Sequence, residues 1–181
     1  MVEKLAQITL LIVNYLGIFL TGLLLSRFFM QAFRVPFNNR IGDFVLPMTS
    51  WLVIPLRKII PPFLNFDSAS FTAAYLIQVF LLVMVFLFSP DFGLSTPETI
   101  LQIAINGLLS LARITIYMFI ILLIIQAILS WFKPEALRNH PVNLITTPLL
   151  RPLRRIIPTV ANIDLTPLIA LLLAQIALLF L

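Results

Sequence analysis

The stretch Pro55-Leu56-Arg57-Lys58-Ile59-Ile60-Pro61 returns ninety-seven residues later, with one Lys-to-Arg exchange, as Pro152-Leu153-Arg154-Arg155-Ile156-Ile157-Pro158. The same offset aligns further identical residues: Asn65 with Asn162, Asp67 with Asp164, Ala73 with Ala170, and Gln78 with Gln175. Two prolines, a basic pair, an Asn-x-Asp and a distant glutamine do not stay in register by chance. The chain therefore consists of two copies of one structural unit, which we expect to cover residues 1–90 and 91–181.

The composition of the chain indicates a membrane protein. Of its 181 residues, 61% are hydrophobic and 10% are charged, whereas about a quarter of a soluble domain is charged. A transmembrane helix needs about 17–25 apolar residues, and four uncharged runs meet this requirement: 5–26, 68–90, 114–132 and 165–181. None of these runs alternates as a barrel strand does. We predict an all-α membrane protein with four transmembrane helices.

Lysine and arginine are distributed unevenly between the predicted loops. Loops 34–70 and 132–164 together hold nine of them, loop 89–102 holds none, and the N-terminus holds Lys4. Because cytoplasmic loops are enriched in Lys and Arg, we expect the two basic loops in the cytoplasm and both termini outside. Each unit has an even number of spans, so the two units form parallel tandem repeats around an axis along the membrane normal.

Each repeated tract has the pattern of a short amphipathic helix. Thr147 and Pro148 suit a helix start, and the apolar and basic residues that follow fall on different faces. The pattern predicts interfacial helices over 52–60 and 149–157, so that each unit is helix, short amphipathic helix, helix. A basic residue beside the membrane contributes about 1 kcal/mol of attraction to anionic lipid. The candidate residues for binding lipid headgroups or a membrane-protein partner are Arg57, Lys58, Arg151, Arg154 and Arg155. Simple anchoring of the topology is the alternative.

A carboxylate follows each tract. Asp67 and Asp164 come just before the second apolar run of their unit, and Thr166 with Pro167 is typical of a helix start. A negative side chain is stabilised at a helix N-terminus. We therefore expect Asp67, Asp164 and Thr166 to start the second helices, with both aspartates paired to arginines of the tracts. An ion or proton site is the alternative.

Isolated polar residues interrupt the apolar runs. Gln78 and Gln175 each lie eleven residues beyond their aspartate, roughly 16 Å along a helix. Lipid offers an amide no partner, so we expect hydrogen bonds between helices, from Gln to Gln or to a backbone carbonyl. Lining of a pore is the alternative. We interpret Asn14 and Gln126 as packing or kink positions and Arg113 as a side chain that reaches the outer surface.

The sequence shows no pattern of catalytic, cofactor-binding or metal-binding residues. It has no cysteine, which excludes thiolate ligands, CxxCH haem attachment and cysteine nucleophiles. His140 is the single histidine; we expect a solvated loop side chain, with axial haem ligation as the alternative. Gly-rich phosphate loops and paired deep carboxylates do not occur. We therefore expect no enzyme and no cofactor. We also expect no nucleic-acid partner, because the basic residues behind the net charge of +5 first report the topology of a membrane protein.

The motifs of the second unit resemble the YggT family, which includes the YlmG proteins of Gram-positive bacteria and plastids. They are Ser130-Trp131, His140-Pro141, the stretch 147–158 and Asp164-Leu165-Thr166-Pro167. The first unit departs from the pattern, with Ile54 in place of Arg151 and Ser70 in place of Pro167. The resemblance implies a multi-pass protein of the bacterial inner membrane. It also implies links to envelope and division phenotypes, to osmotic or potassium stress, and in plastids to haem attachment during cytochrome assembly, which the absence of cysteine fits poorly.

Two functions follow as hypotheses. The first is a non-enzymatic membrane scaffold or assembly factor, which presents the two basic helices to anionic lipid headgroups or to a membrane-protein partner. The second is an oligomeric protein for ion conduction or osmotic adaptation, in which Gln78 and Gln175 line the path.

Overall fold

The computed structural model describes residues 2–61, 66–88, 97–132, 135, 140–155 and 164–181. Six helices follow one another along this part of the chain: α1 (Val2–Ala32), α2 (Arg40–Ile59), α3 (Ser68–Leu87), α4 (Pro97–Phe132), α6 (Pro141–Arg154) and α7 (Thr166–Leu179). The all-α prediction is therefore confirmed. Each half of the chain has a long helix, a helix with the basic tract, and an apolar helix, as the repeat predicts.

Three helices are long and apolar enough to cross a membrane, with candidate spans Gln7–Ala32, Ser68–Leu87 and Glu98–Ser130. The fourth predicted span forms only the shorter apolar helix α7, of 14 residues, which is roughly 21 Å long. The prediction of four full spans is thus confirmed for three of them. α4 is one helix of 36 residues, roughly 54 Å long and longer than the hydrocarbon core of about 30 Å.

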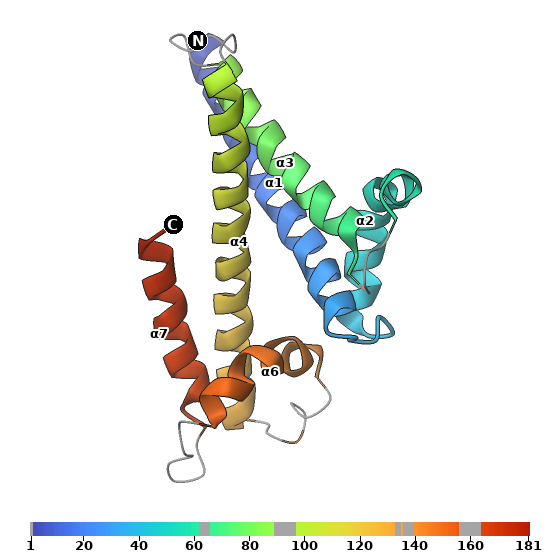
Figure 1. Ribbon diagram of the computed structural model, residues 1–181, viewed down its shortest axis with the longest axis vertical. Coiled ribbons are helices and arrows are strands. Elements are labelled where there is room, and N and C mark those ends of the chain that lie inside the picture. The colour runs from blue at the N-terminus through green and yellow to red at the C-terminus, as the bar shows by residue number, and fades with distance from the viewer. Residues whose placement is uncertain (1, 62–65, 89–96, 133–134, 136–139, 156–163) are drawn as a thin grey trace.

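The helices of the first unit form the best-packed part of the molecule. α1 and α3 lie side by side, and α4 packs against both of them (Figure 1). Gly17 of α1 lies directly under Leu81 of α3, and Gly107 of α4 lies against Val79 of α3, so small residues allow close approach of the backbones. The buried core joins four helices through Leu24, Leu25, Val53, Ala69, Ala73, Ala74 and Leu111.

The second unit is more open. α7 packs against α4 and α6, and α6 lies across one end of α4 (Figure 1). A small buried cluster of Met30, Val35 and Ile145 connects the end of α1 with α6. The two units therefore meet where α4 packs against α1 and α3 and where α6 packs against the end of α1.

Three local features form the turn between α1 and α2. Arg34 has a left-handed φ of 55°, and the Val35 amide donates to the Met30 carbonyl at 2.8 Å, which together close the end of α1. The Asn39 side chain accepts from two amides at the start of α2. Gly42 is required there, because a Cβ at this position would collide with the Phe37 carbonyl.

The basic helices are longer than the sequence predicts. α2 begins at Arg40 rather than at residue 52, and α6 begins at Pro141 rather than near Thr147. Both helices carry two prolines in their interior, so Pro148 does not mark the start of α6, which begins at another proline, Pro141. Thr147 lies inside α6 and donates to the Asn143 side chain at 3.2 Å. Because Asn39 and His140 provide the caps, earlier starts are stable. α6 ends at Arg154, with its C-cap at Arg155, and so stops before the predicted end at residue 157, which itself lies outside the described residues.

Candidate functional site

A bidentate ion pair connects the basic tract of the first unit to the start of α3. Arg57 donates from Nη2 to Asp67 Oδ2 at 2.7 Å and from Nε to Asp67 Oδ1 at 3.2 Å. Asp67 is fully buried and also accepts from the Ser70 hydroxyl at 2.6 Å. It caps α3, as expected, and the arginine holds the end of α2 beside this cap.

A second arginine, which the sequence analysis missed, reaches the same carboxylate. Arg27 of α1 is 4% exposed and places Nε 3.4 Å from Asp67 Oδ2. Its Nη1 donates to the hydroxyls of Thr49 at 2.9 Å and Ser50 at 3.2 Å. One buried carboxylate thus faces two guanidinium groups, and this cluster joins α1, α2 and α3. The sequence could have indicated this role of Arg27, because a lone charged residue inside an apolar helix needs a partner.

These neighbours control the ionisation of Asp67. Burial acts to raise the pKa of the carboxyl, but the hydrogen bonds from Arg57 and Ser70 and the charges of Arg57 and Arg27 outweigh it, so the pKa lies below the usual value. Asp67 is therefore ionised at neutral pH, and it compensates one of the two arginine charges.

The second unit repeats the ion pair in a more exposed setting. Arg154 places Nε and Nη2 each 3.0 Å from Asp164 Oδ2, and Asp164 Oδ1 accepts from the Thr166 amide at 2.9 Å. Burial raises the pKa of Asp164, and the bonds from Thr166 and the charge of Arg154 lower it by more, so the pKa is below its usual value. α7 begins at Thr166, as predicted.

A neutral amide replaces Arg27 in the second unit. Thr146 is the counterpart of Thr49, and its hydroxyl donates to the Gln126 side chain of α4. Gln126 is fully buried and donates to Asn143 Oδ1 at 3.3 Å. Its expected packing role therefore takes the form of hydrogen bonds between α4 and α6. The equivalent threonines of the two units therefore bond to different groups, Thr49 to the charged Arg27 and Thr146 to the neutral Gln126.

The five candidate basic residues divide into two groups. All five are exposed, but Arg57 and Arg154 each bind an aspartate. Within the described residues, no acidic partner contacts Lys58, Arg151 or Arg155. The paired arginines position the tracts, and the other three side chains leave their charge available.

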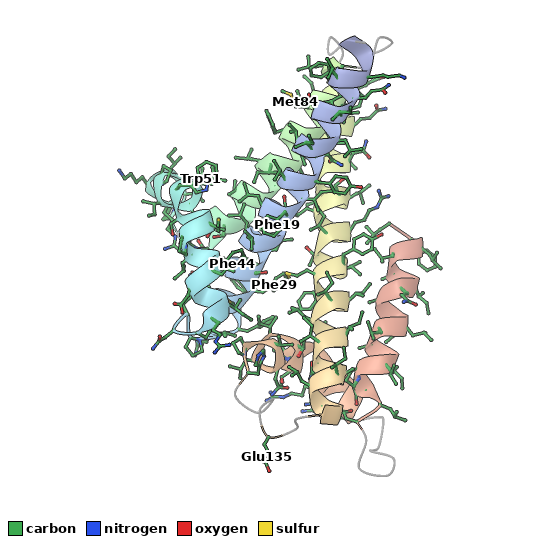
Figure 2. The ribbon with its side chains drawn as sticks, turned by 180° about the vertical axis from the view of Figure 1, so that it is seen from behind. Phe19, Phe29, Phe44, Trp51, Met84 and Glu135 are labelled. Atoms are coloured by element: carbon green, nitrogen blue, oxygen red, sulfur yellow. The ribbon has the colours of Figure 1, made fainter. Side chains whose placement is uncertain are left out.

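The apolar face predicted for the first basic helix is largely internal. Val53 is fully buried and Leu52 and Leu56 pack on the core of the first unit, so this face contacts protein rather than lipid. A different set of large apolar side chains points outward: Phe44, Met48, Trp51 and Ile54. Figure 2 shows α2, with Phe44 and Trp51 labelled, at the edge of the molecule, on the far side of α1 and α3 from α4. In α6, Leu149 and Pro148 are exposed beside Arg151.

The two glutamines have different surroundings. Gln78 is buried, and its Nε2 donates to the Thr21 hydroxyl of α1 at 2.8 Å. Gln175 is exposed on α7. The expected hydrogen bond between helices is therefore present for Gln78, with Thr21 as the partner. The alternative prediction of a bond between Gln78 and Gln175 is wrong. Gln78 also lines a cavity of about 230 Å³ with Asn14 and Arg113.

Arg113 and His140 both have local partners. Arg113 is exposed and donates to the Leu181 carbonyl beyond the end of α7. His140 was expected as a solvated loop residue, but it caps α6 with Nδ1 accepting from the Val142 amide at 3.3 Å. Among the described residues, no group of three His, Cys, Asp or Glu side chains could hold a metal ion.

The architecture defines a class: multi-pass α-helical membrane proteins built from two units, each with an Arg–Asp pair that fixes a basic helix. Comparison with known proteins identifies the family within it. Residues 6–88 and 105–181 match the sequence model of the CCB3/YggT family, and the chain belongs to this family. The two matched segments fall in the two halves of the chain.

Several bacterial relatives cover most of this chain. The uncharacterized protein PA0392 of Pseudomonas aeruginosa is 33% identical over 163 residues, 89% of this chain and 81% of its own length. The uncharacterized protein YggT of Escherichia coli K12 is 32% identical over 157 residues, 84% of this chain and 78% of its own length. No solved structure matches the chain.

Proposed function

We propose that this protein is a non-enzymatic membrane scaffold that binds the headgroups of anionic lipids through its two basic helices. The observation that carries the proposal is the division among the five basic residues. Arg57 and Arg154 are each paired with an aspartate, whereas Lys58, Arg151 and Arg155 are exposed without an acidic partner among the described residues. A lipid phosphate supplies the missing negative charge.

The surroundings of these three residues favour lipid over a soluble anion. Trp51 and Ile54 are 63% and 56% exposed one to two turns before Lys58, and Leu149 is 46% exposed beside Arg151. Exposed apolar side chains next to cations are typical of helices that lie at a membrane surface, and tryptophan is enriched at that depth. Three cations at about 1 kcal/mol each give about 3 kcal/mol, which is more than a hundredfold preference for anionic lipid.

The proposed location follows from the loop charges. Lysine and arginine gather in the loops that contain the two basic helices, so these helices face the cytoplasmic leaflet of the bacterial inner membrane. The role of assembly factor extends the proposal, because a surface with fixed lipid headgroups can also dock a membrane-protein partner. The alternative is an ion path lined by Gln78 and Gln175. Gln78 does line a cavity with Asn14 and Arg113, but its amide is bonded to Thr21, and Gln175 is exposed on α7.

The test compares two pairs of charge reversals. The site variant is Arg151→Glu with Arg155→Glu, and the matched control is Arg34→Glu with Arg40→Glu, which changes net charge equally at other exposed arginines. The measurement is the number of phosphatidylglycerol molecules retained per protein in native mass spectrometry. We expect the site variant to lose retained lipid and the control to keep it.

Equal retention in the two variants would show that the basic helices have no special affinity for the lipid. A photo-reactive residue at position 155 in native membranes gives a second measurement. A lipid adduct supports the proposal, whereas an adduct with one acidic protein and none with lipid replaces it with protein docking.

A further inference from the structure

The outward face of α7 corresponds, through the repeat, to a face of α3 in the first unit that contacts other helices. In α3, Phe71, Tyr75, Gln78 and Leu82 are spaced by four, three and four residues, which places them on one side of the helix. The Tyr75 hydroxyl donates to the Ala104 carbonyl of α4 at 3.1 Å, and the Gln78 amide donates to Thr21 of α1. Protein helices therefore cover this side of α3 at Tyr75 and Gln78, whereas Phe71 at the start of the helix is 39% exposed.

The same positions on α7 are uncovered. The offset of ninety-seven residues places Leu168, Leu172, Gln175 and Leu179 at these positions, and we call them the α7 stripe. Leu172 is 57% exposed and Leu179 is 84% exposed. Ala170 and Ala174, on the opposite side of α7, line an apolar groove with α4 and α6. The stripe thus points away from the bundle.

Gln175 makes this face unsuited to contact with lipid alone. It lies nine residues after the start of α7, roughly 14 Å along the helix, and within the described residues it has no hydrogen-bond partner. Lipid chains offer an amide neither donor nor acceptor, and the equivalent Gln78 has a partner. A further helix beside the stripe would supply the Gln175 amide with a partner.

We propose that two copies of this protein pair through the α7 stripe, α7 against α7, with the Gln175 side chains bonded to each other. All copies of a membrane protein have the same orientation, so two α7 helices run parallel and Gln175 lies at the same depth in both. An amide carries both a donor and an acceptor, so two of them are self-complementary across a twofold axis. The four–three–four spacing of the stripe is also that of a helix pair.

The pairing uses none of the basic residues, so it does not depend on the proposed binding of lipid.

The test uses the absence of cysteine from the chain. A single Leu172→Cys variant, oxidised in native membranes, is expected to form a disulfide-linked dimer of twice the chain mass. The control is Ile12→Cys on α1, whose parent side chain is 51% exposed but lies outside the stripe. Equal cross-linking of the two variants, or linkage only to proteins of other mass, overturns the proposal.

The contribution of the amide is measured separately. Gln175→Leu is expected to weaken dimerisation by roughly 3- to 30-fold, as measured by energy transfer between labelled copies in proteoliposomes. Gln175→Asn keeps an amide and is expected to retain most of the affinity. Gln175 is exposed in the monomer, so neither change should alter its fold. An unchanged affinity in Gln175→Leu overturns the pairing of the two amides.

Discussion

Removal of the negative charge of Asp67 tests the strongest consequence of the structure. Asp67 is fully buried and faces the guanidinium groups of Arg27 and Arg57. The change Asp67→Asn keeps the shape of the side chain but leaves two positive groups close together without compensation. Among the described residues of the second unit, Arg154 is the one arginine paired with Asp164, and both side chains are partly exposed, so Asp164→Asn is the matched control.

The expected magnitudes differ because burial differs. Breaking a buried ion pair from one side costs about 3–5 kcal/mol, whereas an exposed pair contributes about 0–1 kcal/mol. We therefore expect Asp67→Asn to lower the free energy of unfolding by roughly 2–5 kcal/mol more than Asp164→Asn. The double variant Asp67→Asn with Arg27→Gln should recover part of the loss, because it removes the surplus charge.

The assay is unfolding of the purified protein in mixed micelles by increasing fractions of sodium dodecyl sulfate, followed by circular dichroism. The two single variants and the double variant are compared with the parent protein. The reasoning is refuted if Asp67→Asn and Asp164→Asn unfold at the same detergent fraction, or if the added Arg27→Gln change makes the protein less stable still.

Three further predictions use the same unfolding assay. Gly42→Ala should lower the free energy of unfolding by several kcal/mol, because the added Cβ would meet the Phe37 backbone. Gly22→Ala has open space around the added Cβ and should be neutral or stabilise by up to about 1 kcal/mol. Equal effects of the two changes would contradict the packing at the start of α2. Gln78→Leu and Thr21→Val should show a coupling of roughly 0.6–2 kcal/mol in a double-mutant cycle, and strict additivity would exclude their hydrogen bond. The lowered pKa of Asp67 means that the unfolded chain binds more protons in acid. The contribution of Asp67 to stability should therefore be fully present above about pH 5 and be lost as the pH drops further, and Asp67→Asn should flatten the dependence of stability on pH below about pH 5.

Local patterns in the sequence predicted the ion pairs correctly. Arg57 and Asp67 are ten residues apart, as are Arg154 and Asp164, and the tract and the following helix start bring such neighbours together whatever the rest of the fold does. The prolines misled the prediction of the helix starts, because they lie inside α2 and α6. The Asn39 cap was not recognised, and His140 was assigned to a loop.

The sequence by itself determined the repeat, the apolar helices and the pairing of each basic tract with its aspartate, because periodicity, hydrophobic length and short-range charge pairing act along the chain; it predicted four full spans, of which the structure has three. Only the tertiary structure decided which equivalent residues are buried. Arg27 reaches Asp67, and Gln78 reaches Thr21, from a helix distant in sequence. Gln175 has the same position in its unit as Gln78, but it lies at the surface. The physical reason is that α4 and α1 cover one side of α3, whereas no described helix covers the same side of α7.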